Sequence, residues 1–226
     1  MNTQHSVTAS APGKTNLFFA VGPLQDDGFH EVASVYLALD LLEEVTVTPA
    51  EAWSVSVTGN VSAEQIASVP TDESNLVVKA AKHVAELAGV DAQPIAFSIN
   101  KHVPVAGGMG GGSADAAAAL LAVNALWCTG IDSKLAESVS LGADIPFALV
   151  GGVAIGLGRG EDLTQIQSVH PIHLVLVTSD EGLSTPAVYK RLDELRAARG
   201  IDPKLAAEAV VPEELIRALQ AGGDTT

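Results

Sequence analysis

Apolar and polar positions follow two different periods along the chain. From residue 95 to 99 the sequence Ile-Ala-Phe-Ser-Ile alternates apolar and small residues, which is typical of a β-strand. Residues 74–88 carry apolar side chains at a spacing close to 3.6, which predicts an amphipathic helix that Ser74 or Asn75 can cap. A chain that combines both periods is expected to belong to the α/β class.

The same reasoning predicts further elements. Strands are expected over residues 7–21, 31–41, 43–47, 53–58 and 173–178, which are apolar or alternate. Helices are expected over residues 114–127, from residue 134 and from residue 185, with two short helical segments between residues 192 and 219. On the helix predicted over residues 74–88, we expect Lys79, Lys82 and His83 to face solvent.

A glycine-rich stretch follows the strand predicted over residues 95–99. Residues 107–112, which we call the glycine loop, contain five glycines in six positions, and an alanine-rich run from residue 114 follows at once. Glycine lets a ligand approach the main chain, and alanine favours a helix. A strand, a glycine loop and a helix start present backbone N–H groups to an anion. We therefore predict a phosphate site; a mere packed turn is disfavoured, because ordering five glycines costs entropy.

Two common nucleotide-binding motifs do not match this loop. A P-loop has lysine after its last glycine, whereas Ser113 follows Gly112 here. A dinucleotide fingerprint also needs a third glycine, where Gly108 and Gly110 are followed by Ser113. The run P-x-x-G-G-M-G-G-G-S-A-D-A-A from Pro104 instead resembles the second motif of the GHMP small-molecule kinases, named for galacto-, homoserine, mevalonate and phosphomevalonate kinases.

Charge narrows the choice of partner. The 226 residues include 12 Lys and Arg against 27 Asp and Glu, a net charge of −15, which argues against nucleic acid or an anionic membrane surface. A phosphate site must then rest on backbone dipoles or local cations. Cys128 is the one cysteine, so no intrachain disulfide is expected and a reducing cytoplasm fits. No apolar run approaches the length of a membrane span, and the oligomeric state stays open.

Three further segments resemble parts of GHMP kinases. A-P-G-K-T-N-L-F-F from Ala11 is similar to their first motif, although Lys14 alone also suits an edge strand. D-G-F-H from Asp27 and G-R-G-E from Gly158 resemble the branch that acts on a cytidylyl-linked sugar alcohol; alone, Asp-Gly is a turn signal. G-A-D-I-P from Gly142 resembles the segment that carries the family's catalytic base, although its aspartate alone equally suits a turn cap.

The resemblance covers roughly residues 7–195 and implies a fold. That fold is the α/β (α+β) GHMP kinase fold, with an N-terminal ATP-binding domain of the ribosomal S5 domain 2-like type over residues 1–160. Residues 161–226 would form a partial C-terminal GHMP domain. The family's third motif, a Gly/Ser-rich turn, is not found, so we expect the C-terminal domain to be truncated.

The resemblance also implies roles for named residues. The implied reaction transfers the γ-phosphoryl group of ATP, with Mg²⁺, to the 2-hydroxyl of a cytidylyl-linked sugar alcohol in non-mevalonate isoprenoid synthesis. Asp144 would accept the hydroxyl proton, with Lys14 beside it. The implied ATP contacts are Pro104, Gly107, Gly108, Gly110, Gly111, Gly112, Ser113 and Ala114, with Ser113 also helping to hold Mg²⁺. The implied substrate contacts are Asn16, Phe29, His30, Lys101 and Tyr189.

Alternatives remain at both levels. The chain could be another GHMP kinase, against which the D-G-F-H segment speaks, or a non-catalytic nucleotide-binding relative, which the missing third motif favours. Taken by themselves, Lys101 equally suits a solvated strand end and Tyr189 suits core packing. Asp115 is the rival base, but its place after the glycines suits capping or metal binding better.

Overall fold

The computed structural model describes residues 5–168, 171–177 and 182–221. The chain forms two compact units. Unit 1 comprises Met1–Lys14 and Ala38–Gly151, and unit 2 comprises Thr15–Leu37 and Gly152–Thr226. Each unit is discontinuous because two long strands, β1 (Val7–Leu24) and β2 (His30–Pro49), pass from one unit into the other.

The sheet of unit 1 consists of β3 (Ser54–Gly59), β4 (Ile95–Lys101) and the unit 1 parts of β1 and β2. β3 lies parallel to β4, and β4 lies antiparallel to β2, with Val47 opposite Phe97. β1 pairs with β2. The sequence predicted two strands over 31–41 and 43–47, but they form one strand, because the residues between them keep an extended backbone.

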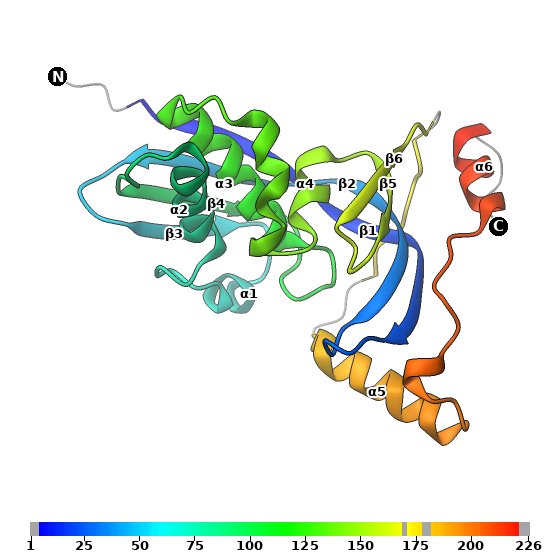
Figure 1. The fold of residues 1–226 in the computed structure, drawn as a ribbon. Helices are drawn as coiled ribbons and strands as arrows, with labels where there is room; N and C mark the ends of the chain where they lie inside the picture. Colours follow the sequence, from blue (N-terminus) through cyan, green and yellow to red (C-terminus); the bar gives the residue numbers. More distant parts are fainter. Residues whose placement is uncertain (1–4, 169–170, 178–181, 222–226) are drawn as a thin grey trace. The chain divides into compact units, whose positions relative to one another are not determined.

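Helices cover one side of this sheet in unit 1 (Figure 1). They are α2 (Leu76–Ala88), α3 (Gly111–Trp127), the 3₁₀ segment η1 (Asp132–Leu141) and α4 (Ile145–Val150). The short helix α1 (Ala63–Ser68) follows β3 and contributes no side chain to the core under these helices. The side chain of Asn75 accepts the N–H of Val77 and caps α2, and Gly89 ends that helix with a φ of 67°. Gly89 illustrates the left-handed helix end that glycine favours.

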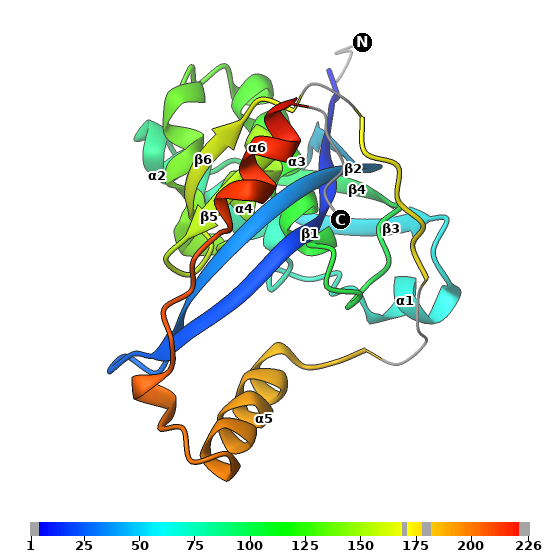
Figure 2. The same cartoon turned by 90° about the vertical axis from the view of Figure 1, so that its right-hand side faces the viewer.

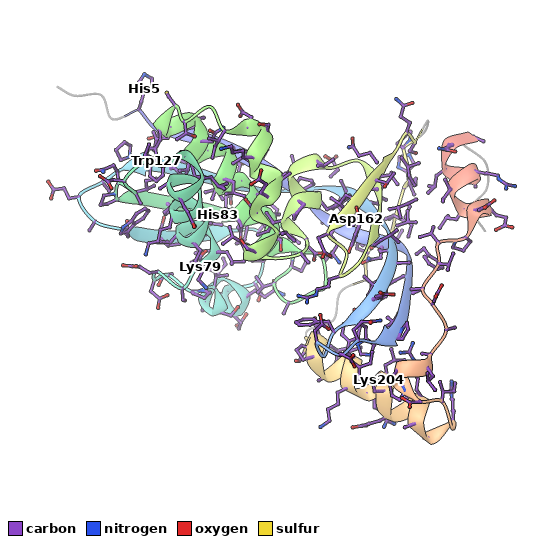
Figure 3. The ribbon with its side chains drawn as sticks, viewed as in Figure 1. His5, Lys79, His83, Trp127, Asp162 and Lys204 are labelled. Carbon is purple, nitrogen blue, oxygen red and sulfur yellow. The ribbon has the colours of Figure 1, made fainter. Side chains whose placement is uncertain are left out.

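The core of unit 1 lies between α2, α3 and the sheet. Seven of the 17 residues of α3 are alanine, and the helix is buried on nearly all sides, because small side chains let it approach both α2 and the strands. Phe97 and Ile99 of β4 and Leu120 of α3 are among its largest buried side chains. On α2, Lys79 is exposed as predicted, whereas the side chain of His83 is only 14% exposed (Figure 3).

Unit 2 is smaller and contains the part of the six-stranded sheet that includes β5 and β6. The first part of β2 lies antiparallel to β5 (Val153–Leu157), which lies antiparallel to β6 (Asp162–Ile166). The helical segments are α5 (Thr185–Ala198), η2 (Pro203–Leu205) and α6 (Glu213–Ala221). α6 packs on this sheet through Leu219, beside Val35, Val153 and Ile166 (Figure 2).

The strand predicted over residues 173–178 is wrong where the structure describes it. Residues 173–177 form no strand, and residue 178 lies outside the described residues. Val175 is 91% exposed and Val177 is 93% exposed. A strand needs a neighbour to bond its backbone and to cover its apolar face. None of the strands in the described part of the chain pairs with this segment.

Among the residues that the structure describes, no helix has the length and apolar character needed to cross a membrane.

Candidate active site

The glycine loop connects β4 to the N-terminus of α3. Gly108 and Gly110 have φ values of 72° and 67°, in the left-handed region that favours glycine. Gly110 is the N-cap of α3 and has no side chain, so no capping side chain occupies the N–H groups of the first turn. Seventeen residues of helix lie behind them, and the helix dipole places partial positive charge at this end. The loop can therefore hold an anion through its main chain.

A pocket of about 420 Å³ lies over this loop in unit 1. This volume falls in the range of small-molecule sites, roughly 300–1,000 Å³. The wall opposite the loop comes from the segment that leads into α2. The lining residues are Ser68, Val69, Pro70, Ser74, Asn75, Leu76, Lys101, residues 104–112 and Asp115. The predicted phosphate-binding stretch thus faces a space that can hold a ligand.

Lys14 and Asp144 meet beside the glycine loop. Lys14 Nζ lies 3.8 Å from Asp144 Oδ2, and both side chains are less than one-third exposed. The backbone N–H of Lys14 donates to the carbonyl of Met109 at 2.9 Å, which ties β1 to the loop. A Cβ at Gly110 would lie 3.3 Å from Lys14 Cγ and 3.7 Å from Asp144 Oδ2. The predicted catalytic pair and the predicted phosphate site are therefore neighbours.

Asp144 is the N-cap of α4, but its carboxylate makes no capping hydrogen bond. Pro146 follows at the second position of this helix, where a missing N–H costs nothing. The turn-capping alternative for this aspartate therefore has no support in the structure. Its carboxylate keeps acceptor capacity beside Lys14.

Lys101 lies in a buried cluster with Glu43 and Asp115. Lys101 Nζ is 2.7 Å from Glu43 Oε1 and 2.7 Å from Asp115 Oδ2, and the lysine side chain is 2% exposed. Lys101 is therefore not a solvated strand end. Asp115 Oδ1 is buried without a hydrogen-bond partner among the described residues. Burial raises the pKa of Asp115 to about 7. The positive charge of Lys101 lowers this pKa and the negative charge of Glu43 raises it, and the effect of burial is the largest of the three.

The predicted substrate residues of unit 2 form two groups. The His30 ring stacks on Tyr189 at 5.1 Å between ring centroids, and His30 Nε2 lies 2.9 Å from Asp193 Oδ1. Phe29 is 53% exposed, and the Arg159 guanidinium lies 3.9 Å from its ring centroid. The D-G-F-H and G-R-G-E segments, far apart in sequence, thus lie together.

One further predicted residue, Asn16, and two residues that the sequence analysis did not identify also belong to these sites. Asn16 Nδ2 donates to Ser34 Oγ at 2.6 Å in unit 2. Sequence reasoning missed Asp193, although its position four residues after Tyr189 places both on one helix face, which is a usable signal. It also missed Glu43, for which the sequence holds no local signal.

The residues at the loop fit a magnesium ion that arrives with a nucleotide. The described residues contain no cluster of three or more His, Cys, Asp or Glu that could hold a metal ion. Mg²⁺ is usually held by substrate phosphates, waters and one or two protein ligands. Ser113, half-buried in the first turn of α3, offers one hydroxyl of that kind.

Comparison with known proteins decides the family. The model of the GHMP kinases N terminal domain matches residues 75–152, which include the glycine loop, α3 and Asp144. The 4-diphosphocytidyl-2-C-methyl-D-erythritol kinase of Arthrobacter sp. (strain FB24) is 46% identical over 222 residues, covering 96% of this chain and 68% of that protein. The kinase of the same name from Leifsonia xyli subsp. xyli is 47% identical, with coverages of 96% and 71%. The chain belongs to the family of these GHMP kinases.

Two more comparisons complete the assignment. The same kinase from Mycolicibacterium vanbaalenii is 46% identical, and this chain covers 66% of its length. The chain thus spans about two thirds of the length of these curated relatives. A crystal structure of 4-(cytidine 5'-diphospho)-2C-methyl-D-erythritol kinase matches with a TM-score of 0.65 and 29% identity, covering 96% of this chain and 72% of that one. The predicted family and fold class are confirmed.

A more distant match shows the fold alone. L. major mevalonate kinase has a TM-score of 0.65 at 15% identity, with coverages of 97% and 71%.

Proposed function

We propose that this chain transfers the γ-phosphoryl group of ATP to the 2-hydroxyl of 4-diphosphocytidyl-2-C-methyl-D-erythritol, in non-mevalonate isoprenoid synthesis. The observation that carries the proposal is the Lys14–Asp144 pair beside the left-handed Gly110. The relatives described above bear the name of this kinase. Phosphoryl transfer mainly needs positioning and charge stabilisation, and an arrangement of backbone amides, a lysine and a carboxylate supplies both.

The ATP phosphates would lie on the glycine loop. The N–H groups at the start of α3, from Gly111 to Ser113, would bind phosphate oxygens. The N–H of Ala114 already donates to the carbonyl of Gly110, so Ala114, Pro104, Gly107, Gly108 and Gly110 would shape the approach. Mg²⁺ would neutralise charge on the phosphates, and the Ser113 hydroxyl would help to hold it. Because the chain has a net charge of −15, its overall field repels the ATP phosphates, and the helix dipole of α3 must overcome this repulsion at the loop.

The acceptor hydroxyl would lie at the Lys14–Asp144 pair. Asp144 would accept the hydroxyl proton as the bond to phosphorus forms. The Lys14 ammonium would stabilise the negative charge that develops on the attacking oxygen. Both residues lie beside Gly110, so the proton acceptor and the phosphate site would be adjacent.

The cytidylyl part of the substrate would be bound by unit 2. His30, held by Asp193 and stacked on Tyr189, would present a ring nitrogen to the cytosine edge. Phe29 would offer a face for stacking, Asn16 would add hydrogen bonds, and Lys101, which lines the pocket of unit 1, would act near the phosphates.

The domain boundary and the location of the protein remain proposals. We place the ATP-binding domain at residues 1–160 and a partial C-terminal GHMP domain at residues 161–226. The two compact units divide the chain differently, because β1 and β2 contribute to both. A cytoplasmic location accords with the single cysteine.

A turnover assay separates this function from its alternatives. The chain is incubated with MgATP and 4-diphosphocytidyl-2-C-methyl-D-erythritol, mevalonate or homoserine, and phosphorylated product is detected by mass spectrometry. We expect product from the cytidylyl substrate alone. Product from mevalonate or homoserine would indicate another GHMP kinase. Binding of ATP without any product would indicate a non-catalytic nucleotide-binding relative, which the missing third motif favours.

A further inference from the structure

We infer that Glu43 is a positioning residue that holds the glycine loop in the shape required for nucleotide phosphates. The inference rests on the proposed ATP site. Glu43 is fully buried at 0% exposure, so it acts through its neighbours and not by touching a ligand.

The Glu43 carboxylate holds the main chain that enters the glycine loop. Its Oε2 accepts the N–H of His102 at 3.1 Å, and its Oε1 accepts the N–H of Val103 at 3.2 Å. These residues join the end of β4 to Pro104, where the phosphate-binding motif begins. A buried carboxylate that accepts two backbone N–H groups fixes the direction of that main chain.

The same carboxylate also connects to the helix that leaves the loop. Glu43 Oε1 lies 2.7 Å from Lys101 Nζ, and Lys101 Nζ lies 2.7 Å from Asp115 Oδ2. Asp115 belongs to α3, which begins at Gly111. One side chain of β2 is thus linked to the entry of the loop directly and to its exit through one lysine.

The contact with the loop backbone is close. A Cβ at Gly111 would lie 3.1 Å from Glu43 Oε1 and 3.3 Å from Lys101 Nζ, tighter than most real contacts of this kind. The glutamate therefore packs directly against the main chain whose N–H groups are proposed to bind phosphate. A shift of this carboxylate would move those N–H groups.

Glu43→Gln tests the inference, with Glu44→Gln as the matched control. The substitution replaces one carboxylate oxygen by an NH₂ donor, which then faces either Lys101 or a backbone N–H. Glu44 is the next residue of β2 and is exposed, so its variant loses the same charge without disturbing the loop. MgATP affinity is measured by calorimetry at a temperature where circular dichroism shows each variant fully folded. We expect Glu43→Gln to bind MgATP at least about tenfold more weakly, because the loop loses a charged acceptor that holds its backbone. We expect Glu44→Gln to match the parent within about twofold.

A second readout works without nucleotide. The backbone amide resonances of Gly108, Gly110 and Gly111 report the shape of the loop by NMR. If Glu43 positions the loop, these amide resonances should shift in Glu43→Gln and should stay unchanged in Glu44→Gln. If Glu43→Gln does not fold, Glu43→Asp replaces it, because a carboxylate shorter by one methylene cannot keep both N–H bonds and Lys101 together.

The outcomes separate this inference from the proposed function. Parental MgATP affinity and unshifted glycine resonances in a folded but less stable Glu43→Gln would mean a purely structural role and would overturn the inference. A parent chain that does not bind MgATP would overturn the proposed function. In that case shifted resonances in Glu43→Gln alone would still support positioning of the loop by Glu43, and unshifted ones would overturn it.

Discussion

At the scale of single residues, Gly110 meets two requirements at once. Its φ of 67° disfavours any residue with a Cβ, and its position beside Lys14 and Asp144 leaves little room for one. Lys14 in turn is tied to the loop by its own N–H. Substitutions at these few positions are therefore expected to affect binding or chemistry before they affect the fold.

We expect Gly110→Val to abolish ATP binding and to leave the fold largely intact. The side chain would contact Lys14 and block the approach of phosphate to the loop amides. Gly89→Val is the matched control: Gly89 has the same φ of 67° with nothing within 4 Å of an added Cβ, and it lies outside the pocket lining. Both variants should lose about 1–3 kcal/mol of stability from backbone strain. Calorimetry with MgATP should show binding in Gly89→Val only; equal ATP affinity in Gly110→Val would contradict the assignment of the loop.

For the proton acceptor, we expect Asp144→Asn to keep the affinity for both substrates within a few fold. Turnover should fall by about 10² or more, the usual scale for loss of a general base. Lys14→Met should behave likewise, and the double variant should be little worse than either, because the pair acts as a unit. Steady-state kinetics measure all three. Near-parental turnover in Asp144→Asn together with loss in Asp115→Asn would show that the base is assigned to the wrong aspartate.

For substrate choice, we expect Phe29→Ala and His30→Ala to weaken the cytidylyl substrate much more than ATP. Each removes a stacking or edge contact on the order of 1–3 kcal/mol. Phe19→Ala is a suitable control, since Phe19 is a similarly exposed phenylalanine of unit 2 at 49% exposure. Titration with a cytidine nucleotide measures the effect. Parental cytidine affinity in both variants would remove the main support for this substrate.

At the scale of elements, the segment of β4, the glycine loop and α3 contributes most of the site. The sequence predicted each part of this segment, since strand alternation, glycine and alanine are local signals. The helix begins at Gly111 and not at residue 114, because two glycines of the loop already adopt helical angles. The burial of Asp115 was not predictable, because it depends on Lys101 and Glu43 from two other strands.

The raised pKa of Asp115 makes stability depend on pH. Its pKa is about 7 in the folded chain, so between about pH 4 and pH 7 the folded state holds a proton that the unfolded state has released. The free energy of unfolding contributed by this group therefore falls as pH rises through that range and levels off above it. Urea denaturation of the parent and of Asp115→Asn, without metal or nucleotide, measures this. We expect the stability of the variant relative to the parent to increase from pH 5 to pH 7; a constant difference would contradict the raised pKa.

At the scale of the whole molecule, residues that are close in the sequence can belong to different compact units. Both compact units are assembled from separate stretches, because β1 and β2 each continue from one unit into the other. A pass along the sequence finds these strands but cannot assign their two halves to different units. Lys204 of η2, labelled in Figure 3, likewise has its Nζ 2.8 Å from Asp26 Oδ1 in unit 2, although the two residues are 178 positions apart.

The sequence by itself determined the family, the glycine loop and the two candidate catalytic residues. These depend on backbone preference and side-chain chemistry within a few neighbouring positions, which any copy of the motif carries with it. Only the tertiary structure decided that Glu43 supports the loop entered at His102, 59 positions later, and that the apolar stretch around Val175 forms no strand. A buried ion cluster and a β-strand both need partners from elsewhere in the chain, and the identity of those partners is set by packing and not by local sequence.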